Sequence, residues 1–227
     1  IQGASKDVVL TQSKGIQLNG GVVSLTIKDL TIASSANFLD IYTSTDTHSV
    51  KLENVTVNSS AAANGNFIYV SKTKANVEIV DCTVNSTNGI RLLFATTGSN
   101  VTSYVVTNTN ITNAVVARAE NAGIVGSASN PAVLTDLTSD KVLFYVYTGT
   151  IYADVFGGTF TGTLVYGGDN HNNTLRLRTN PTGDKTTTFT FASTSEYGAF
   201  VYQNPSDATK NNLTFSFRNT NVTDTGS

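Results

Sequence analysis

The sequence predicts an all-β protein, a right-handed parallel β-helix (solenoid) of roughly eight coils. Three observations predict it: apolar residues alternate with a period near two, strong helix formers are few, and the strand pattern recurs every 25–27 residues. β-Branched Val, Ile and Thr dominate the apolar runs, and Asn, Gly, Ser and Thr bound them. We therefore expect many short strands and almost no helix.

The first series of strands carries a short polar residue at a fixed position. It comprises segments 25–32, 50–57, 77–84 and 104–111, with weaker copies at 154–160 and 215–222. The shared residue recurs at intervals of 25, 27 and 27, as Asp29, Asn54, Asp81 and Asn108. Asp and Asn tolerate the left-handed backbone region and bond to nearby backbone, and stacked Asn and Thr can bond to their equivalents above and below. We expect this column to mark the bend between two sheets.

A second series follows about a dozen residues after the first. Its segments are 38–42, 67–70, 90–94, 115–118, 143–147, 164–166 and 200–202. Each strand of a solenoid pairs with its counterpart one coil away, so we expect parallel sheets with right-handed crossovers. A β-sandwich is the alternative, but sandwiches lack a register that repeats at this interval. Three longer insertions, 121–131, 179–185 and 204–211, are expected to be loops that leave the coil.

The charge balance excludes one class of partner. The chain has 14 basic and 16 acidic side chains among 227 residues, and Lys and Arg never cluster, so no nucleic-acid surface is expected. Hydrophobic residues reach 39%, enough to bury a core. No apolar run approaches the roughly 18 residues of a membrane helix, so no membrane insertion is expected.

Several features indicate a single domain, residues 1–227, excised from a longer surface protein. Met and Trp are absent and the first residue is Ile. The single cysteine, Cys82, can form neither an internal disulfide nor an ordinary zinc site, and we expect it in the core or wall of a coil. Scarce cysteine with abundant hydroxyl residues favours an extracellular protein.

The repeated pattern apolar-x-(Asp/Asn)-x-Thr-(Val/Ile) resembles the pectate-lyase-like β-helix superfamily across most of the chain. The low-charge composition, rich in Thr, Asn and Ser, resembles bacterial cell-wall adhesins. Among these it is similar to the ligand-binding region of the serine-rich repeat adhesins of gut lactobacilli. The resemblance implies a module on the bacterial cell surface that binds acidic sugars and host epithelium.

The enzymes of this superfamily need side chains that the pattern does not supply. β-Helix lyases hold calcium with several Asp residues, and the glycosidases place carboxylates on adjacent coils. Here Asn54 and Asn108 interrupt the acidic column, and the motifs Asn-Thr-Asp, Asp-Asp and Gly-His-Gly do not occur. The nearest acid–base pairs are Asp169 with His171, expected in a turn, and Asp46 with His48, expected in a solvated loop. We expect no catalytic residue, metal or cofactor.

The second strand series predicts a ligand-binding face. If Ile90, Leu92 and Phe94 point inward, then Arg91 points outward. The same alternation places further side chains outside: Tyr42, Tyr69, Arg118, Tyr145, Tyr147, Tyr166 and Tyr202. Near the far end, Arg176 and Arg178 share one side of a strand. Stacking along a column accounts for the tyrosines by stability alone, but it does not account for arginine among them.

Aromatic rings suit the apolar faces of sugars, and arginine binds carboxylates with two hydrogen bonds. We therefore expect a non-catalytic adhesin module that binds acidic polysaccharide, such as pectin-like polyuronate, or host mucin glycans. A pectin-acting lyase or glycoside hydrolase and a purely structural stalk remain alternatives. The expected ligand-binding residues are Arg91, Arg118, Lys141, Arg176 and Arg178 for carboxylates and Tyr145, Tyr147 and Tyr166 for ring stacking.

Overall fold

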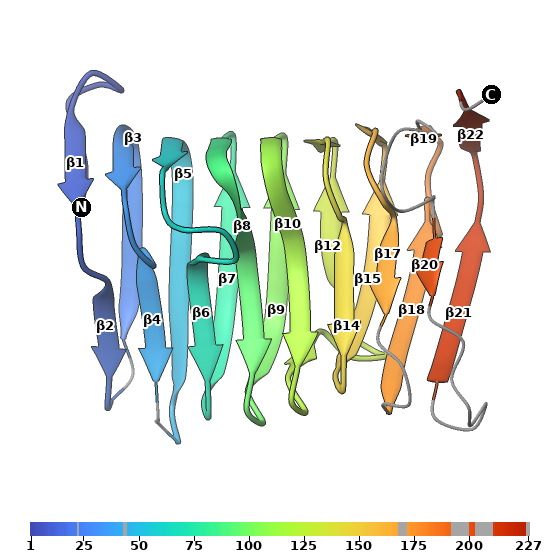
Figure 1. Cartoon of the computed structure of the whole chain (residues 1–227), viewed down its shortest axis with the longest axis horizontal. Helices are drawn as coiled ribbons and strands as arrows, with labels where there is room; N and C mark the ends of the chain where they lie inside the picture. Colours follow the sequence, from blue (N-terminus) through green and yellow to red (C-terminus); the bar gives the residue numbers. More distant parts are fainter. Residues whose placement is uncertain (22, 43–44, 168–171, 192–199, 203–210, 226–227) are drawn as a thin grey trace.

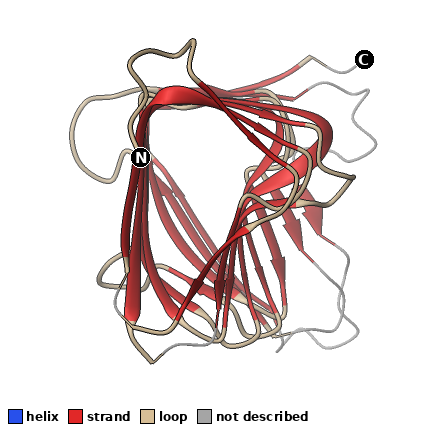
Figure 2. Cartoon of the chain, turned by 90° about the vertical axis from the view of Figure 1, so that its left-hand side faces the viewer, coloured by secondary structure: helices blue, strands red, loops and turns tan. Residues whose placement is uncertain are grey.

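The computed structural model confirms the predicted architecture. It describes residues 1–21, 23–42, 45–167, 172–191, 200–202 and 211–225. Within these residues the protein is an all-β solenoid of about seven turns, close to the eight expected, and every strand pairing is parallel. The strands form three long faces, which we call face A, face B and face C, around a packed interior (Figure 2).

Most coils contribute one strand segment to each face, and one coil contributes two short segments, 124–125 and 132–135, to face A. Face A contains residues 24–28 of β3 (Ser24–Ser34), residues 47–53 of β5 (Thr47–Ser59), β7 (Lys74–Val80), β9 (Asn100–Thr107), β11 (Ile124–Val125), β12 (Ala132–Thr135), β15 (Thr150–Phe156), β18 (Asn173–Thr179) and β21 (Asn211–Phe217). Face B contains β1 (Val9–Gln12), the ends of β3 and β5, the starts of β8 (Thr83–Thr96) and β10 (Asn110–Glu120), β13 (Thr138–Ser139), β16 (Gly158–Phe160), β19 (Thr187–Phe191) and β22 (Thr220–Asp224).

Face C corresponds to the second strand series. It contains β2 (Ile16–Asn19), β4 (Leu39–Tyr42), β6 (Asn66–Ser71), the ends of β8 and β10, β14 (Phe144–Tyr147), β17 (Val165–Gly167) and β20 (Phe200–Tyr202). In Figure 1 its strands run downward in front while those of face A run upward behind, as the chain advances from left to right. This sense of winding is right-handed, as predicted.

The polar column lies at the bend between faces A and B. Asp29, Asn54, Asp81 and Asn108 all have φ between 46° and 57°, the left-handed region that short polar side chains tolerate. Their side chains also bond from coil to coil: Asn54 Nδ2 donates to Asp29 Oδ1 at 2.9 Å, and Asn108 Nδ2 donates to Asp81 Oδ1 at 2.6 Å. The column therefore fixes the corner and the stacking of successive coils together.

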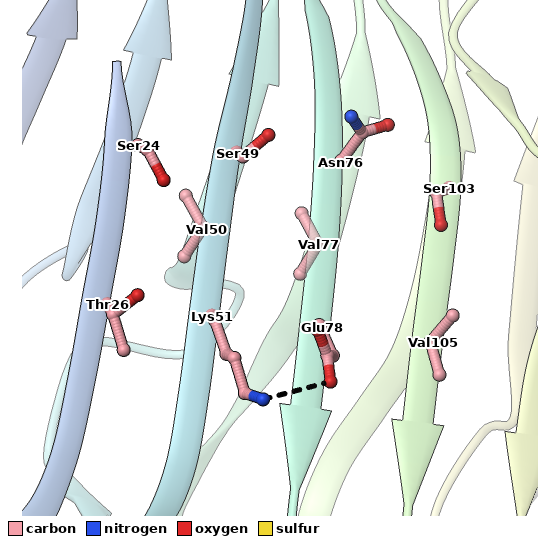
Figure 3. A pocket seen from close by; sticks show the side chains of 10 residues that line it. All are labelled: Ser24, Thr26, Ser49, Val50, Lys51, Asn76, Val77, Glu78, Ser103 and Val105. Atoms are coloured by element: carbon pink, nitrogen blue, oxygen red, sulfur yellow. Dashed lines mark ion pairs between the residues drawn. The ribbon is translucent and has the colours of Figure 1, made fainter.

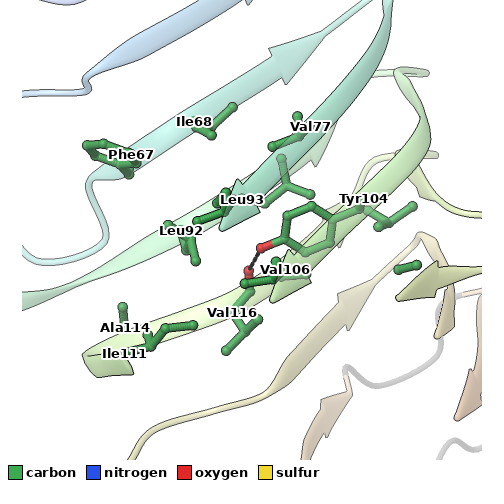
Figure 4. Packing of buried hydrophobic residues seen from close by; sticks show 14 of the residues in the cluster. Phe67, Ile68, Val77, Leu92, Leu93, Tyr104, Val106, Ile111, Ala114 and Val116 are labelled. Carbon is green, nitrogen blue, oxygen red and sulfur yellow. Dashed lines mark hydrogen bonds between the residues drawn. The ribbon is translucent and has the colours of Figure 1, made fainter. Parts of the chain in front are cut away.

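The interior is filled by columns of apolar side chains that stack from coil to coil. One column on face A has no exposed surface in any of its six members, which are Ile27, Leu52, Ile79, Val106, Leu134 and Val155. Tyr104 also points inward from face A and crosses the interior, where its hydroxyl donates to the Val116 carbonyl at 2.9 Å (Figure 4). This tyrosine therefore connects two faces of the solenoid through the core.

Two predictions about single segments have different outcomes. Cys82 is buried as expected, and its burial raises the pKa of the thiol, which makes it a poor nucleophile at neutral pH. The segment 121–131 was expected to leave the coil, but β11 within it pairs with β9 and β15 on face A. Residues 121–123 form a turn and residues 126–131 form a loop that stays against face A.

Candidate functional site

The outer side of face C carries a continuous row of aromatic and arginine side chains. Tyr69, Phe94, Arg118 and Tyr145 occupy one register position on four successive coils, and we call them the outer row. Their sequence neighbours on both sides are buried, so the row points outward. The Tyr69 and Phe94 ring centroids are 5.5 Å apart, and Tyr42 lies 5.5 Å from Tyr69 on the other side.

The prediction that Phe94 points inward is wrong. Leu92 and Leu93 are both fully buried, so the alternation changes phase between Arg91 and Phe94. The same pair of consecutive buried residues occurs where other coils enter face C, in Phe38–Leu39, Phe67–Ile68, Val116–Ala117 and Leu143–Phe144. The chain turns a corner there, and a corner directs two adjacent side chains into the interior. Arg91 and Phe94 consequently both lie on the outer side, with the guanidinium carbon 4.8 Å from the ring centroid. Arg91, Arg118 and Tyr69 cover the Phe94 ring and leave that residue only 9% exposed.

Arg118 is part of the wall rather than a free cation. Its guanidinium lies between two rings of the row, 5.2 Å from the Phe94 centroid and 4.0 Å from the Tyr145 centroid. Its Nε and Nη2 both donate to the Glu120 carboxylate, with 2.8 Å from Nε, and its side chain is only 15% exposed. The sequence predicts that Arg118 binds a ligand carboxylate, but in the structure its guanidinium already binds the carboxylate of Glu120.

Arg91 is different, because no acidic side chain in the described part of the chain pairs with it. Its Nη1 donates to Asn66 Oδ1 at 3.2 Å, and its other nitrogens are not shut off from solvent. Burial, with a smaller contribution from the nearby Arg118 charge, lowers the pKa of Arg91 to about 10. Arg91 therefore remains a cation at neutral pH, and its guanidinium has donors beyond the one that Asn66 accepts.

A hollow of about 470 Å³ adjoins this arginine at the corner between faces B and C. Asn37 and Gly65 line it, and Asn37 Oδ1 accepts from the backbone N–H of Asn66 at 2.9 Å. Asn66 thus links the hollow to Arg91, because its Oδ1 accepts from the Arg91 guanidinium. The backbone N–H of Arg91 also donates to the Gly65 carbonyl. The side-chain groups that line the hollow include the hydroxyls of Ser13 and Ser35, and the Asn37 amide there already bonds to Asn66 and Asp40.

Asp40 lines the same hollow and is 9% exposed. Burial raises the pKa of its carboxyl, and a hydrogen bond from Asn37 lowers it less. A raised acid pKa means that the folded state is weakened once the carboxyl ionises, and that this penalty disappears below the unfolded pKa of about 4.

We therefore expect Asp40→Asn to raise the melting temperature at pH 7 and to leave it unchanged at pH 3. Asparagine keeps the acceptor for Asn37 and removes the charge. Thermal unfolding of both proteins at the two pH values measures the effect. A lower melting temperature for the variant at pH 7 would show that the ionised carboxylate stabilises the fold.

The other predicted tyrosines and Lys141 lie on or just before face C. Tyr147 lies on face C in register with Glu120, and of Tyr166 the structure describes the backbone, which pairs with Tyr145. Lys141 precedes face C, and its Nζ donates to Asn113 Oδ1 at 2.6 Å. Tyr202 is likewise described in its backbone alone.

Arg176 and Arg178 do not join the outer row. They lie on β18, which pairs with β15 and β21, so they point outward from face A. Arg178 donates to Asp154 from Nε at 2.8 Å and from Nη2 at 2.6 Å, and these bonds raise the pKa of Arg178. The predicted arginines and tyrosines therefore do not form one strip: Arg176 and Arg178 lie on face A, and the others lie on or beside face C.

Face A also carries a shallow groove that the sequence did not suggest (Figure 3). It has a volume of about 300 Å³ and is lined by small polar side chains of four successive coils, including Ser24, Ser49, Asn76 and Ser103. Lys51 lies between Glu53 at 2.9 Å and Glu78 at 3.3 Å, and hydrogen bonds to both raise the pKa of Lys51. Alternation along these strands predicts that the small polar side chains share one side of face A, but isolated serines do not indicate a groove.

The acid–base pairs considered for catalysis do not form a visible site. The prediction that His48 lies in a solvated loop is wrong: it is fully buried in β5, and neither ring nitrogen has a hydrogen-bond partner among the described residues. Asp169 and His171 lie outside the described residues. Among the residues with described positions, no three His, Cys, Asp or Glu side chains gather as a metal site would require.

Comparison with protein-family models, curated proteins and solved structures finds no match for this chain. The geometry of faces A and C is therefore the basis for a proposed function. Over the described ranges no helix has the length and apolar character needed to cross a bilayer.

Proposed function

We propose that this chain is a non-catalytic adhesin module that binds acidic carbohydrate through the outer side of face C. The proposal is supported by the position of Arg91, an arginine without an acidic partner among the described residues, against the Phe94 ring, which in turn contacts the partly exposed Tyr69 ring. A cation next to an aromatic surface is the combination that a charged sugar requires.

The outer row favours a long carbohydrate over a small ligand. Two partly exposed rings of the row, Tyr69 and Tyr145, lie three coils apart along the solenoid axis, so they offer stacking surfaces to separate sugars of one long chain. The internal pairing of Arg118 with Glu120 holds the middle of the row rigid and neutral. Stacking therefore supplies contact area, and Arg91 supplies selectivity for a carboxylate.

The cellular role is proposed from the sequence resemblance. A rigid solenoid displayed on a bacterial cell surface would present face C to pectin-like polyuronate, to mucin glycans or to a biofilm matrix. Attachment to host or matrix is the function that this arrangement would serve. Parts of a longer protein outside this segment would anchor it to the cell wall.

We expect the protein to bind polygalacturonate at least about tenfold more tightly than the fully methyl-esterified polymer, because esterification removes the charge that Arg91 recognises. Biolayer interferometry with both immobilised polymers measures the ratio. Incubation of each polymer with the protein and calcium, followed by ultraviolet absorbance and reducing-end assays, tests the enzyme alternative.

The possible results distinguish an adhesin, an enzyme and a structural stalk. Equal affinity for the two polymers contradicts recognition of the carboxylate. Product formation establishes a lyase or hydrolase instead of an adhesin. Absence of binding to both polymers and to mucin glycans favours a structural stalk.

A further inference from the structure

Two arginines two residues apart on β18 have unequal surroundings. The Nε and Nη2 edge of Arg178 is bound by both oxygens of Asp154, which lies beside it on β15. At the equivalent position beside Arg176, β15 carries Tyr152. Arg178 thus shows how a carboxylate binds an arginine on this face, and Arg176 lacks the corresponding carboxylate.

The Arg176 guanidinium is held in place but only partly satisfied. Its carbon lies 5.1 Å from the Tyr152 ring centroid, and its Nη1 donates to the Ala128 carbonyl at 3.1 Å. Its Nε and Nη2 are both buried and have no hydrogen-bond partner in the part of the chain that the structure describes. A buried charged donor without an acceptor is costly, so proteins rarely keep one unless something pairs with it.

We propose that face A carries a second acidic-ligand site, in which Nε and Nη2 of Arg176 bind the carboxylate of an acidic sugar. Arg176 and Arg178 against Asp154 leave one positive charge, which a single carboxylate balances. The adjacent side chains on the outer side include the hydroxyl of Thr214, in register on β21, and those of the loop 126–131, which suit sugar hydroxyls. This site does not depend on the proposal for face C.

The loop 126–131 is held on both sides of the site. It begins tightly packed beside β15, because a Cβ on Gly126, which has φ of 70°, would lie 2.7 Å from the Tyr152 carbonyl oxygen. Asn130 Nδ2 donates to the Thr102 carbonyl at 2.7 Å, and the Ala128 carbonyl accepts from Arg176. Nε and Nη2 of Arg176 are closed off from solvent, so the proposal requires that neighbouring groups, such as this loop, shift before a carboxylate binds there.

The test is a titration of ¹⁵N-labelled protein, observed through the arginine Nε–H resonances. The probes are galacturonate and N-acetylneuraminate, with galactose as the neutral control. Arg176→Lys assigns the resonance by its disappearance, and it keeps the charge while removing the side-by-side donors. Arg218→Lys, an exposed arginine at the corner between faces A and B, is the matched control.

We expect both acidic sugars to shift the Arg176 resonance and galactose to leave it unchanged. Arg176→Lys should weaken binding of the acidic sugars at this site by about tenfold or more, whereas Arg218→Lys should not. A response to one acidic sugar alone identifies which source of carboxylate the site accepts. An Arg176 resonance that neither acid shifts, or equal affinity of Arg176→Lys and the unaltered protein, overturns the proposal.

The outcome is independent of face C. An Arg91→Lys variant should leave the Arg176 response unchanged, so failure of the face C proposal would not remove this site. Loss of the Arg176 response would likewise leave binding at Arg91 intact.

Discussion

Replacing Tyr104 with alanine is expected to lower the free energy of unfolding by about 3–5 kcal/mol, the usual cost of removing a large buried aromatic side chain. Tyr104 has no exposed surface, and its ring crosses the interior from face A to the Val116 carbonyl (Figure 4). The surrounding strands are held by backbone bonds to coils on both sides, so they cannot collapse into the space that the ring leaves.

Tyr104→Phe separates packing from hydrogen bonding. It should cost only about 1–2 kcal/mol, because the ring remains and the Val116 carbonyl alone loses a partner. Urea denaturation followed by circular dichroism measures both values. Val105→Ala, the next residue and half-buried on the outer side, is the control, with an expected loss below about 1 kcal/mol. A loss of that small size for Tyr104→Ala would show that the interior repacks freely.

Replacing Arg91 with alanine is expected to weaken binding to oligogalacturonides by about 10- to 100-fold, which corresponds to about 1.5–3 kcal/mol for a hydrogen bond to a charged group. Arg91→Lys should lose most of the same affinity, since an ammonium cannot offer two parallel N–H groups to a carboxylate. Affinity for a neutral galactan should change little in either variant, because the partly exposed Tyr69 ring remains.

Isothermal titration calorimetry with trigalacturonate measures these changes. Lys51→Ala is the matched control, because it removes a half-exposed cation from face A without touching face C. Equal losses from Lys51→Ala and Arg91→Ala would indicate general electrostatic attraction instead of a defined site.

The sequence predicts the architecture well because two independent periods agree. Alternation identifies the strands, and the recurrence of Asp29, Asn54, Asp81 and Asn108 places successive coils in register. Both signals are local or nearly so, and a parallel solenoid stacks each residue on its counterpart one coil away. The corner column and the parallel pairing therefore follow from the pattern.

The candidate site is less predictable, because it depends on contacts between coils and on where the corners fall. The phase change at Leu92 and Leu93 moves Phe94 from the core to the outer row, and strict alternation cannot reveal it. The partner of Arg178 is Asp154, one shorter coil away, so the interval of 25–27 residues does not align the two. The sequence pattern does not show that β18 lies on face A, so it cannot separate Arg176 from the residues of face C.

A crystal structure with trigalacturonate shows whether an acidic glycan binds on face C. We predict a sugar carboxylate within hydrogen-bonding distance of the Arg91 guanidinium and a sugar ring against Tyr69. Trigalacturonate bound on faces A or B alone, with face C left bare in crystals where its outer side is open to solvent, would contradict the claim.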